Sequence, residues 1–132
     1  MDHCHGYGLA LAAALEEIAT EFVLVVQHDW LFVRSVDITS AVASMDADSE
    51  VKYIGMQSIT TLDYARRMQL RYGLELPAPR PGVGGITLVP QLLWYDKPHL
   101  CRAAHYREVV LREAPMGICE CPERRRYGTF FW

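Results

Sequence analysis

The segment Glu21–Val33, EFVLVVQHDWLFV, indicates which fold this chain is expected to adopt. Its apolar, β-branched run, Phe22–Val26, stops abruptly at the polar tripeptide QHD, residues 27–29, before apolar residues resume. A buried strand that delivers an acid at its carboxyl end is a common way for open α/β sheets to build a ligand site. We therefore expect a buried strand over residues 22–26 with a ligand site where that strand ends.

Helix and strand signals alternate on both sides of this strand, which predicts an α/β fold. Helices are expected over about residues 8–19, 38–45 (capped by Asp37), 61–72 (ending at Gly73) and 103–112. Further strands are expected over residues 51–56 and 86–94, where Pro90 should confine the strand to an edge or split it. The apolar face of the 61–72 helix should consist of Leu62, Ala65, Met68, Leu70 and Tyr72. Residues 77–85, with three prolines and three glycines, predict a loop.

Length and composition exclude several classes of protein. A chain of 132 residues that is 51% hydrophobic predicts one globular domain over residues 1–132. The net charge of -3 argues against a nucleic-acid partner, and no apolar run approaches the roughly 20 residues of a membrane span. The start of the chain does not read as a signal peptide, and four unevenly spaced cysteines do not form a secreted disulfide framework. A cytoplasmic protein is the expectation.

Three parts of the sequence together resemble the GT-A fold glycosyltransferases, especially family 2. A glycine-led helix of small residues, a hydrophobic strand and an acid at its end match the core pattern of that family, with Gln27-His28-Asp29 in the place of its Asp-x-Asp motif. The segment Leu92–Glu108 is similar to an acceptor-side strand and helix, and Arg125–Trp132 to the C-terminal edge. The resemblance implies a partial GT-A (nucleotide-diphospho-sugar transferase-like) domain, a mixed sheet flanked by helices.

The sequence also departs from the family pattern. The family's N-terminal nucleotide-binding strands would lie before residue 1, Gln27 replaces the first carboxylate of the motif, and the acidic pair before the acceptor helix has no clear counterpart. The chain is therefore expected to be a fragment or truncated variant of a GT-A domain. A sheet edge left exposed by missing strands would favour homo-oligomers, because unpaired edges offer hydrogen bonds to a second chain.

The resemblance implies inverting transfer of a sugar from a nucleotide-sugar donor to an acceptor hydroxyl. In that reading Gln27, His28 and Asp29 bind the donor diphosphate, and Asp29 holds Mn²⁺ or Mg²⁺, which prefer oxygen ligands. The same comparison makes His105 a further candidate ligand for the metal. The equally weighted alternative is that Asp29 only caps the segment after the strand and that His28 is an ordinary surface residue.

A second cluster, Trp94, Tyr95 and Asp96, combines aromatic rings with a carboxylate, which suits the stacking and hydrogen bonding of an acceptor sugar. The alternative is that the two rings belong to the core and Asp96 begins a turn. The acids left in this part of the chain, Glu113 and Glu120, are the candidate general bases, and both also fit solvated positions.

Two further interpretations compete with the transferase. His3, Cys4 and His5 could bind zinc together with Cys119 and Cys121, although three adjacent ligands diverge too strongly to bind one ion comfortably. The other alternative is a non-catalytic remnant of the fold with a binding or oligomerisation role.

Overall fold

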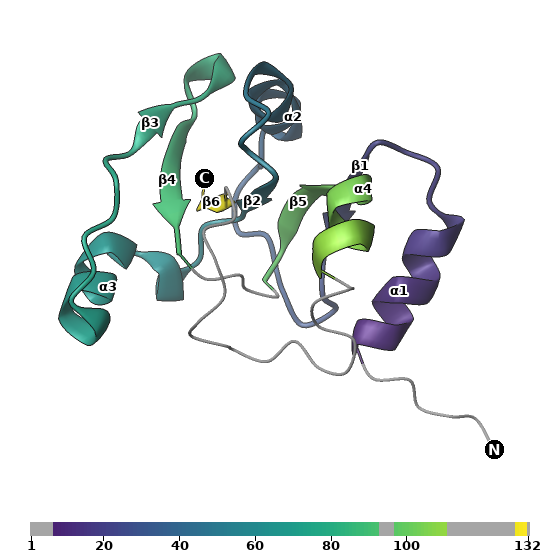
Figure 1. The fold of residues 1–132 in the computed structure, drawn as a ribbon, viewed down its shortest axis with the longest axis horizontal. Helices are drawn as coiled ribbons and strands as arrows, with labels where there is room; N and C mark the ends of the chain where they lie inside the picture. Colours follow the sequence, from purple (N-terminus) through teal and green to yellow (C-terminus); the bar gives the residue numbers. More distant parts are fainter. Residues whose placement is uncertain (1–6, 93–96, 111–128, 132) are drawn as a thin grey trace.

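The computed structural model describes residues 7–92, 97–110 and 129–131, which form a mixed α/β fold (Figure 1). The helices are α1 (Tyr7–Glu17), α2 (Ile38–Ala47), α3 (Tyr64–Tyr72) and the short α4 (Ala103–His105), which continues into a π-helical turn (Tyr106–Val110). The strands are β1 (Phe22–Val25), β2 (Tyr53–Gly55), β3 (Arg80–Pro81), β4 (Thr87–Gln91), β5 (His99–Arg102) and β6 (Thr129–Phe131). Single 3₁₀ turns cover Ile59–Thr61 and Val83–Gly85.

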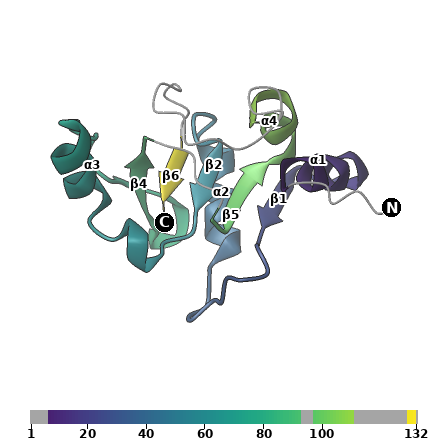
Figure 2. The ribbon, with the colours of Figure 1, turned by 90° about the horizontal axis from the view of Figure 1, so that it is seen from below.

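These strands form one sheet in the order β1-β5-β2-β6-β4-β3 (Figure 2). Strand β5 runs antiparallel to both β1 and β2, so β1 and β2 are parallel to each other. Strand β6 is parallel to β2 and antiparallel to β4. The sheet is therefore mixed, as the sequence led us to expect.

The position of β1 corrects one prediction. Among the described strands β1 lies at the edge of the sheet, so it is not the fully buried strand that its apolar sequence suggested. Leu24 and Val26 are 40% and 44% exposed, whereas Val25 is buried. The run is apolar on both faces, but helices cover only one of them completely at this edge.

The two larger core clusters of the described residues lie on opposite faces of the sheet, and a third, smaller one contains Tyr64 and Met68 of α3. Ile54 and Leu100 pack with Ala41 and Met45 of α2 on one face. Tyr53 and Cys101 pack with Leu15 of α1 and with Tyr106 on the other. Neighbouring residues of β2 and β5 thus point to opposite faces, and Figure 2 shows α2 on one side of the sheet and α1 with α4 on the other.

Local signals account for two of the helix boundaries. The Asp37 carboxylate accepts hydrogen bonds from the backbone N–H of Ser40 (3.0 Å) and from its hydroxyl (2.6 Å), so Asp37 caps α2 as predicted. Gly73 ends α3 in the left-handed conformation (φ 65°).

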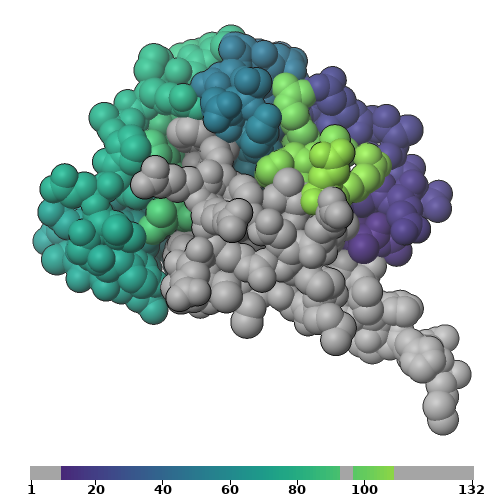
Figure 3. Space-filling model, viewed as in Figure 1, coloured from purple at the N-terminus to yellow at the C-terminus, as the bar shows by residue number. Residues whose placement is uncertain are grey.

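The predicted apolar face of α3 is largely wrong. Met68 is buried as expected, but Leu70 is 76% exposed and Leu62, before the helix, is 49% exposed. The second buried residue of the helix is Tyr64, which packs with Met68 against Val89. Helix α3 lies at one end of the long axis of the molecule and α1 at the other (Figures 1 and 3), so α3 has only the margin of the sheet to pack against.

Strand β4 tolerates Pro90 because of where the proline lies. Pro90 is opposite Phe130 of β6, while β3 pairs only with Thr87 and Leu88. The outer side of β4 at Pro90 therefore has no partner strand among the described residues, and the missing N–H breaks no ladder there. Within the described residues, no helix combines the length and apolar character that crossing a membrane would require.

Candidate functional site

Three loops leave the sheet at the same end, which we call the His99 end. His99, the first residue of β5, is opposite Val25 at the end of β1 and opposite Gly55 at the end of β2. The loops after the two parallel strands and the loop before β5 therefore meet at this end. Crevices at the carboxyl ends of parallel strands are the usual ligand sites of α/β sheets.

The QHD tripeptide forms a tight turn directly after β1. The backbone N–H of Trp30 donates to the carbonyl of Gln27 (3.2 Å), and the indole N–H of Trp30 donates to the Gln27 side-chain oxygen (3.1 Å). Gln27 thus holds the turn together. His28 and Asp29 are exposed at its tip, where a ligand can reach both side chains.

Lys97 joins this turn to the loop after β2. Its ammonium donates to the hydroxyl of Ser58 (3.1 Å) and to that of Thr60, and it lies 5.9 Å from the centre of the Trp30 ring. His99, two residues after Lys97, fixes the Lys97 backbone, because its Nδ1 lies 2.6 Å from the Lys97 carbonyl oxygen.

His99 is itself a core residue. It is fully buried, and its ring stacks on Tyr53 (4.6 Å between centroids) and on Tyr106 (5.5 Å). Since a carbonyl oxygen can only accept, Nδ1 carries the proton that binds the Lys97 carbonyl. His99 therefore fixes the backbone at Lys97 and, being fully buried, is not accessible to a ligand.

Two cavities open at the His99 end. The first, of about 520 Å³, is bordered by the loop after β1 and the loop after β2. The second, of about 670 Å³, lies toward α3 and is lined by Asp63, Tyr64 and Arg66 among others. Arg34 and Gln57 line both cavities, and the Arg34 guanidinium donates to the Gln57 side-chain oxygen (3.2 Å) between them.

One lining position of the second cavity requires glycine. Gly84, which lines it, has φ 69°, and a Cβ built there would lie 2.0 Å from the Ser40 hydroxyl oxygen. Close contact with α2 and a left-handed backbone both exclude larger residues. Asp63, which also lines this cavity, is the one described non-glycine residue with positive φ (55°).

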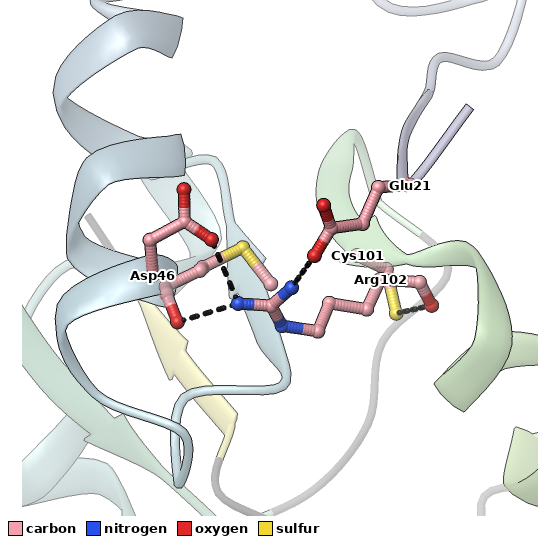
Figure 4. Close-up of polar contacts among 5 residues, drawn as sticks. Glu21, Asp46, Cys101 and Arg102 are labelled. Carbon is pink, nitrogen blue, oxygen red and sulfur yellow. Dashed lines mark hydrogen bonds and ion pairs between the residues drawn. The ribbon is translucent and has the colours of Figure 1, made fainter.

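The other end of the same strands, which we call the Arg102 end, is closed by ion pairs (Figure 4). Arg102 is opposite Phe22, stacks on its ring at 4.6 Å, and donates to the Met45 carbonyl and the Asp46 carboxylate, both at 2.9 Å. It also pairs with Glu21. Burial raises the pKa of the neighbouring Cys101 thiol to about 12, so this cysteine is an unreactive core residue.

The structure places His105 far from the QHD turn along the strands. His105 follows Arg102, whereas Asp29 follows Val25 at the opposite end of the β1–β5 pair. Burial, followed by the nearby Lys52 ammonium, lowers the pKa of His105, while Glu108 opposes this effect. The two residues expected to share a metal are therefore not brought together.

Several predicted site residues lie outside the described residues: Trp94, Tyr95, Asp96, Glu113, Glu120 and the zinc candidates His3, Cys4, His5, Cys119 and Cys121. Within the described part of the chain, no group of three or more His, Cys, Asp and Glu side chains could hold a metal ion. Asp29 is thus the carboxylate on which a metal at the QHD turn would depend.

The structure adds residues that the sequence did not single out, namely Arg34, Gln57, Ser58 and Lys97. Gln57 and Ser58 are polar residues that follow a strand, just as the QHD tripeptide does. The pattern of polar residues after an apolar strand could therefore have identified them as site candidates. No sequence signal connects Lys97 to Trp30, because 66 residues separate the two positions.

Searches for related proteins give no further constraint on the site. No protein-family model, curated protein or solved structure matches the chain.

Proposed function

We propose that this chain is a GT-A-like domain, similar to family 2 glycosyltransferases, which binds a nucleotide-sugar donor and transfers the sugar to an acceptor hydroxyl. One observation carries the proposal. The exposed Asp29 carboxylate lies on a tight turn at the carboxyl end of β1, beside a cavity of about 520 Å³ that reaches the end of the parallel strand β2. The resemblance of Gln27-His28-Asp29 to an Asp-x-Asp motif gives this position its proposed chemistry.

The residues at the turn fit a divalent cation that is shared with a substrate. Mg²⁺ commonly binds through one or two carboxylates, several waters and the phosphates of a substrate, so a single protein carboxylate is a sufficient anchor. Such an ion would neutralise the charge of the leaving diphosphate. Asp29 would hold Mg²⁺ or Mn²⁺, and His28 would donate a hydrogen bond to the diphosphate.

Gln27 has a different role in this proposal from the one the resemblance implied. Because its side-chain oxygen accepts from the Trp30 indole, Gln27 shapes the turn on which Asp29 lies. His105 is left out of the proposed metal site because it follows the opposite end of β5. The proposal thus rests on Asp29 as a metal ligand and on His28 and Lys97 as neighbours of the diphosphate.

The acceptor side of the proposal rests on the sequence. Trp94, Tyr95 and Asp96 immediately precede Lys97 in the sequence, and Lys97 contacts Trp30 of the QHD turn. An acceptor bound by these three residues would therefore be held within three residues of a group that contacts the proposed donor site. Glu113 or Glu120 would accept the proton of the acceptor hydroxyl. Attack on the anomeric carbon with departure of the nucleoside diphosphate would invert the configuration.

Calorimetric titration with UDP- and GDP-sugars, each with and without Mn²⁺, tests the donor site. We expect Mn²⁺-dependent binding of one donor, and Asp29→Ala should weaken it by on the order of ten-fold or more, equivalent to about 1.4 kcal/mol. Asp29→Asn separates the charge from the shape of the side chain. Glu50→Gln, an exposed carboxylate on the turn before β2, is the matched control and should bind as the unmodified chain does.

Two results would overturn the transferase assignment: no metal-dependent binding of either donor, or binding that Asp29→Ala leaves unchanged. The non-catalytic alternative predicts the first of these. Stoichiometric zinc in the purified protein, lost on Cys119→Ser, would instead favour the zinc site.

A further inference from the structure

The second cavity, of about 670 Å³ beside the start of α3, is lined by charged groups of both signs. Arg34 and Arg66 supply guanidinium groups, and Asp63 supplies a carboxylate. All three residues are exposed, so a ligand can reach each of them from solvent. None of them takes part in the donor site proposed at the QHD turn.

Among the described residues, the side chains of Asp63 and Arg66 have no polar partner. Asp63 immediately precedes α3, but its carboxylate makes no capping hydrogen bond to the helix. Residues three positions apart on a helix often form an ion pair, yet the ion pairs within the described part of the chain join other groups. Asp63 has a left-handed backbone (φ 55°, ψ 32°) and therefore does not share the helical geometry of Arg66.

The neighbouring arginines show that Arg66 differs from them. Arg67 donates to the Thr60 carbonyl, whereas Arg66 makes no hydrogen bond to another described residue. Arg34 donates to the Gln57 side-chain oxygen at 3.2 Å. Since a guanidinium has five N–H donors in a planar fork, Arg34 can bind a carboxylate beside this contact.

We infer that this cavity binds a free α-amino acid with an apolar side chain. The ligand ammonium group binds Asp63, and the ligand carboxylate binds the arginine guanidinium groups. A ligand with both charges complements this site, because each unengaged group then gains a charge-assisted hydrogen bond. The ligand side chain contacts the apolar part of the lining, which consists of Ala65, Ile86 and Val89.

The size of the cavity agrees with such a ligand. Small-molecule sites usually have volumes of roughly 300–1,000 Å³ and combine apolar walls with a few polar groups that fix the orientation of the ligand. The cavity of about 670 Å³ falls within this range. The inference does not depend on the proposed function.

The first test titrates the unmodified chain with L-leucine and with two analogues that each lack one charge, N-acetyl-L-leucine and L-leucinamide. A slightly acidic buffer keeps the ammonium group of L-leucinamide charged. Each analogue should bind on the order of ten-fold more weakly than L-leucine, because it lacks one charge-assisted hydrogen bond. The ¹H–¹⁵N signals of Gly84 and Gly85, which line the cavity, should shift on binding, and the Trp30 indole signal in the other cavity should not.

The second test uses exposed residues, so that the variants leave the fold intact. Asp63→Asn removes the charge only, because asparagine also tolerates the left-handed backbone. It should weaken L-leucine on the order of ten-fold and leave N-acetyl-L-leucine, which has no ammonium group, unchanged. Arg66→Gln should weaken L-leucine and leave L-leucinamide unchanged. Glu75→Gln and Arg71→Gln are the matched controls, because both residues are exposed and lie outside the cavity lining.

Four results would overturn the proposal. The first is the absence of shifts at Gly84 and Gly85 with L-leucine, and the second is an analogue that binds as tightly as L-leucine does. The third is tighter binding of inorganic phosphate than of L-leucine, which would indicate a simple anion site. The fourth is a loss of affinity in Arg71→Gln that equals the loss in Arg66→Gln. Asp29→Ala should leave L-leucine binding unchanged, so this proposal and the donor site can fail separately.

Discussion

The two ends of the β1–β5–β2 strands differ in how their polar groups are used. At the Arg102 end, one guanidinium satisfies a helix-terminal carbonyl and two carboxylates and covers an aromatic ring. At the His99 end, Leu31 and Ile59 are exposed around the cavity of about 520 Å³, and Asp29 is exposed on the turn beside it. The comparison indicates that the first end stabilises the sheet and α2, whereas the second end leaves its polar and apolar side chains accessible to solvent.

Arg102→Ala should have the largest effect on stability. It removes charge-assisted hydrogen bonds and the packing of the side chain on Phe22, so we expect the free energy of unfolding to fall by about 2–3 kcal/mol in urea denaturation. The affinity for a nucleotide sugar should not change. Glu21→Gln is the control. Because the Glu21 side chain is 65% exposed, loss of its ion pair with Arg102 should lower the free energy of unfolding by no more than about 0.5 kcal/mol. A loss of affinity in Arg102→Ala that matches its loss of stability would contradict the division between the two ends.

Gln27→Leu should have a smaller effect on stability and a clear effect on binding. The Trp30 indole N–H loses its acceptor, and we expect a loss of about 1 kcal/mol in urea denaturation. Because the turn presents Asp29, metal-dependent donor binding should weaken as well. Gln27→Glu retains an acceptor oxygen and should preserve the turn. If Gln27→Leu lowered stability without changing donor affinity, the turn would be structural only.

Leu24→Lys tests whether two copies of the chain associate through the free edge of β1, the strand that connects the two ends. We predict self-association through this edge, since β1 has one neighbouring strand among those described and Leu24 is 40% exposed. A lysine at the edge should shift the protein from dimer to monomer in sizing chromatography at equal concentration. Monomer elution of the unmodified chain at high concentration would reject the prediction.

The smallest expected effect concerns pH and His105. Burial and Lys52 lower the pKa of His105 in the folded chain, so the unfolded chain, with a pKa of about 6.5, binds more protons as the pH falls. Stability should therefore decrease from about pH 6.5 downward until the pH passes the lowered folded pKa. His105→Asn should reduce the difference in urea midpoint between pH 7.5 and pH 5.5. An unchanged difference would assign the pH dependence to other groups.

Local signals in the sequence predicted two helix boundaries, the start of α2 and the end of α3, but not the start of α3 at Tyr64 or the short extent of α4. Asp37 and Gly73 each act through their own backbone neighbours, so the cap of α2 and the end of α3 are visible in a few adjacent residues. The alternation of strand and helix also predicted the mixed α/β character of the chain.

Predictions that depend on distant partners were less successful. Strand β5 was not identified from its pattern, because four residues following Pro98 give too short an alternation to recognise. The buried residues of α3 were largely mispredicted, because the face that a helix buries depends on what lies beside it. The edge position of β1 likewise depends on which strands pair with it, and the apolar run alone does not contain that information.

The sequence by itself determined that an acid follows an apolar strand at Gln27-His28-Asp29, and it determined the caps that begin α2 and end α3. Only the tertiary structure decided that Gln27 holds the turn, that Lys97 lies over Trp30, and that Asp29 and His105 are at opposite ends of the strands. The reason is physical. Capping and turn formation involve residues a few positions apart, whereas a binding site depends on strand register, which brings together residues far apart in the chain.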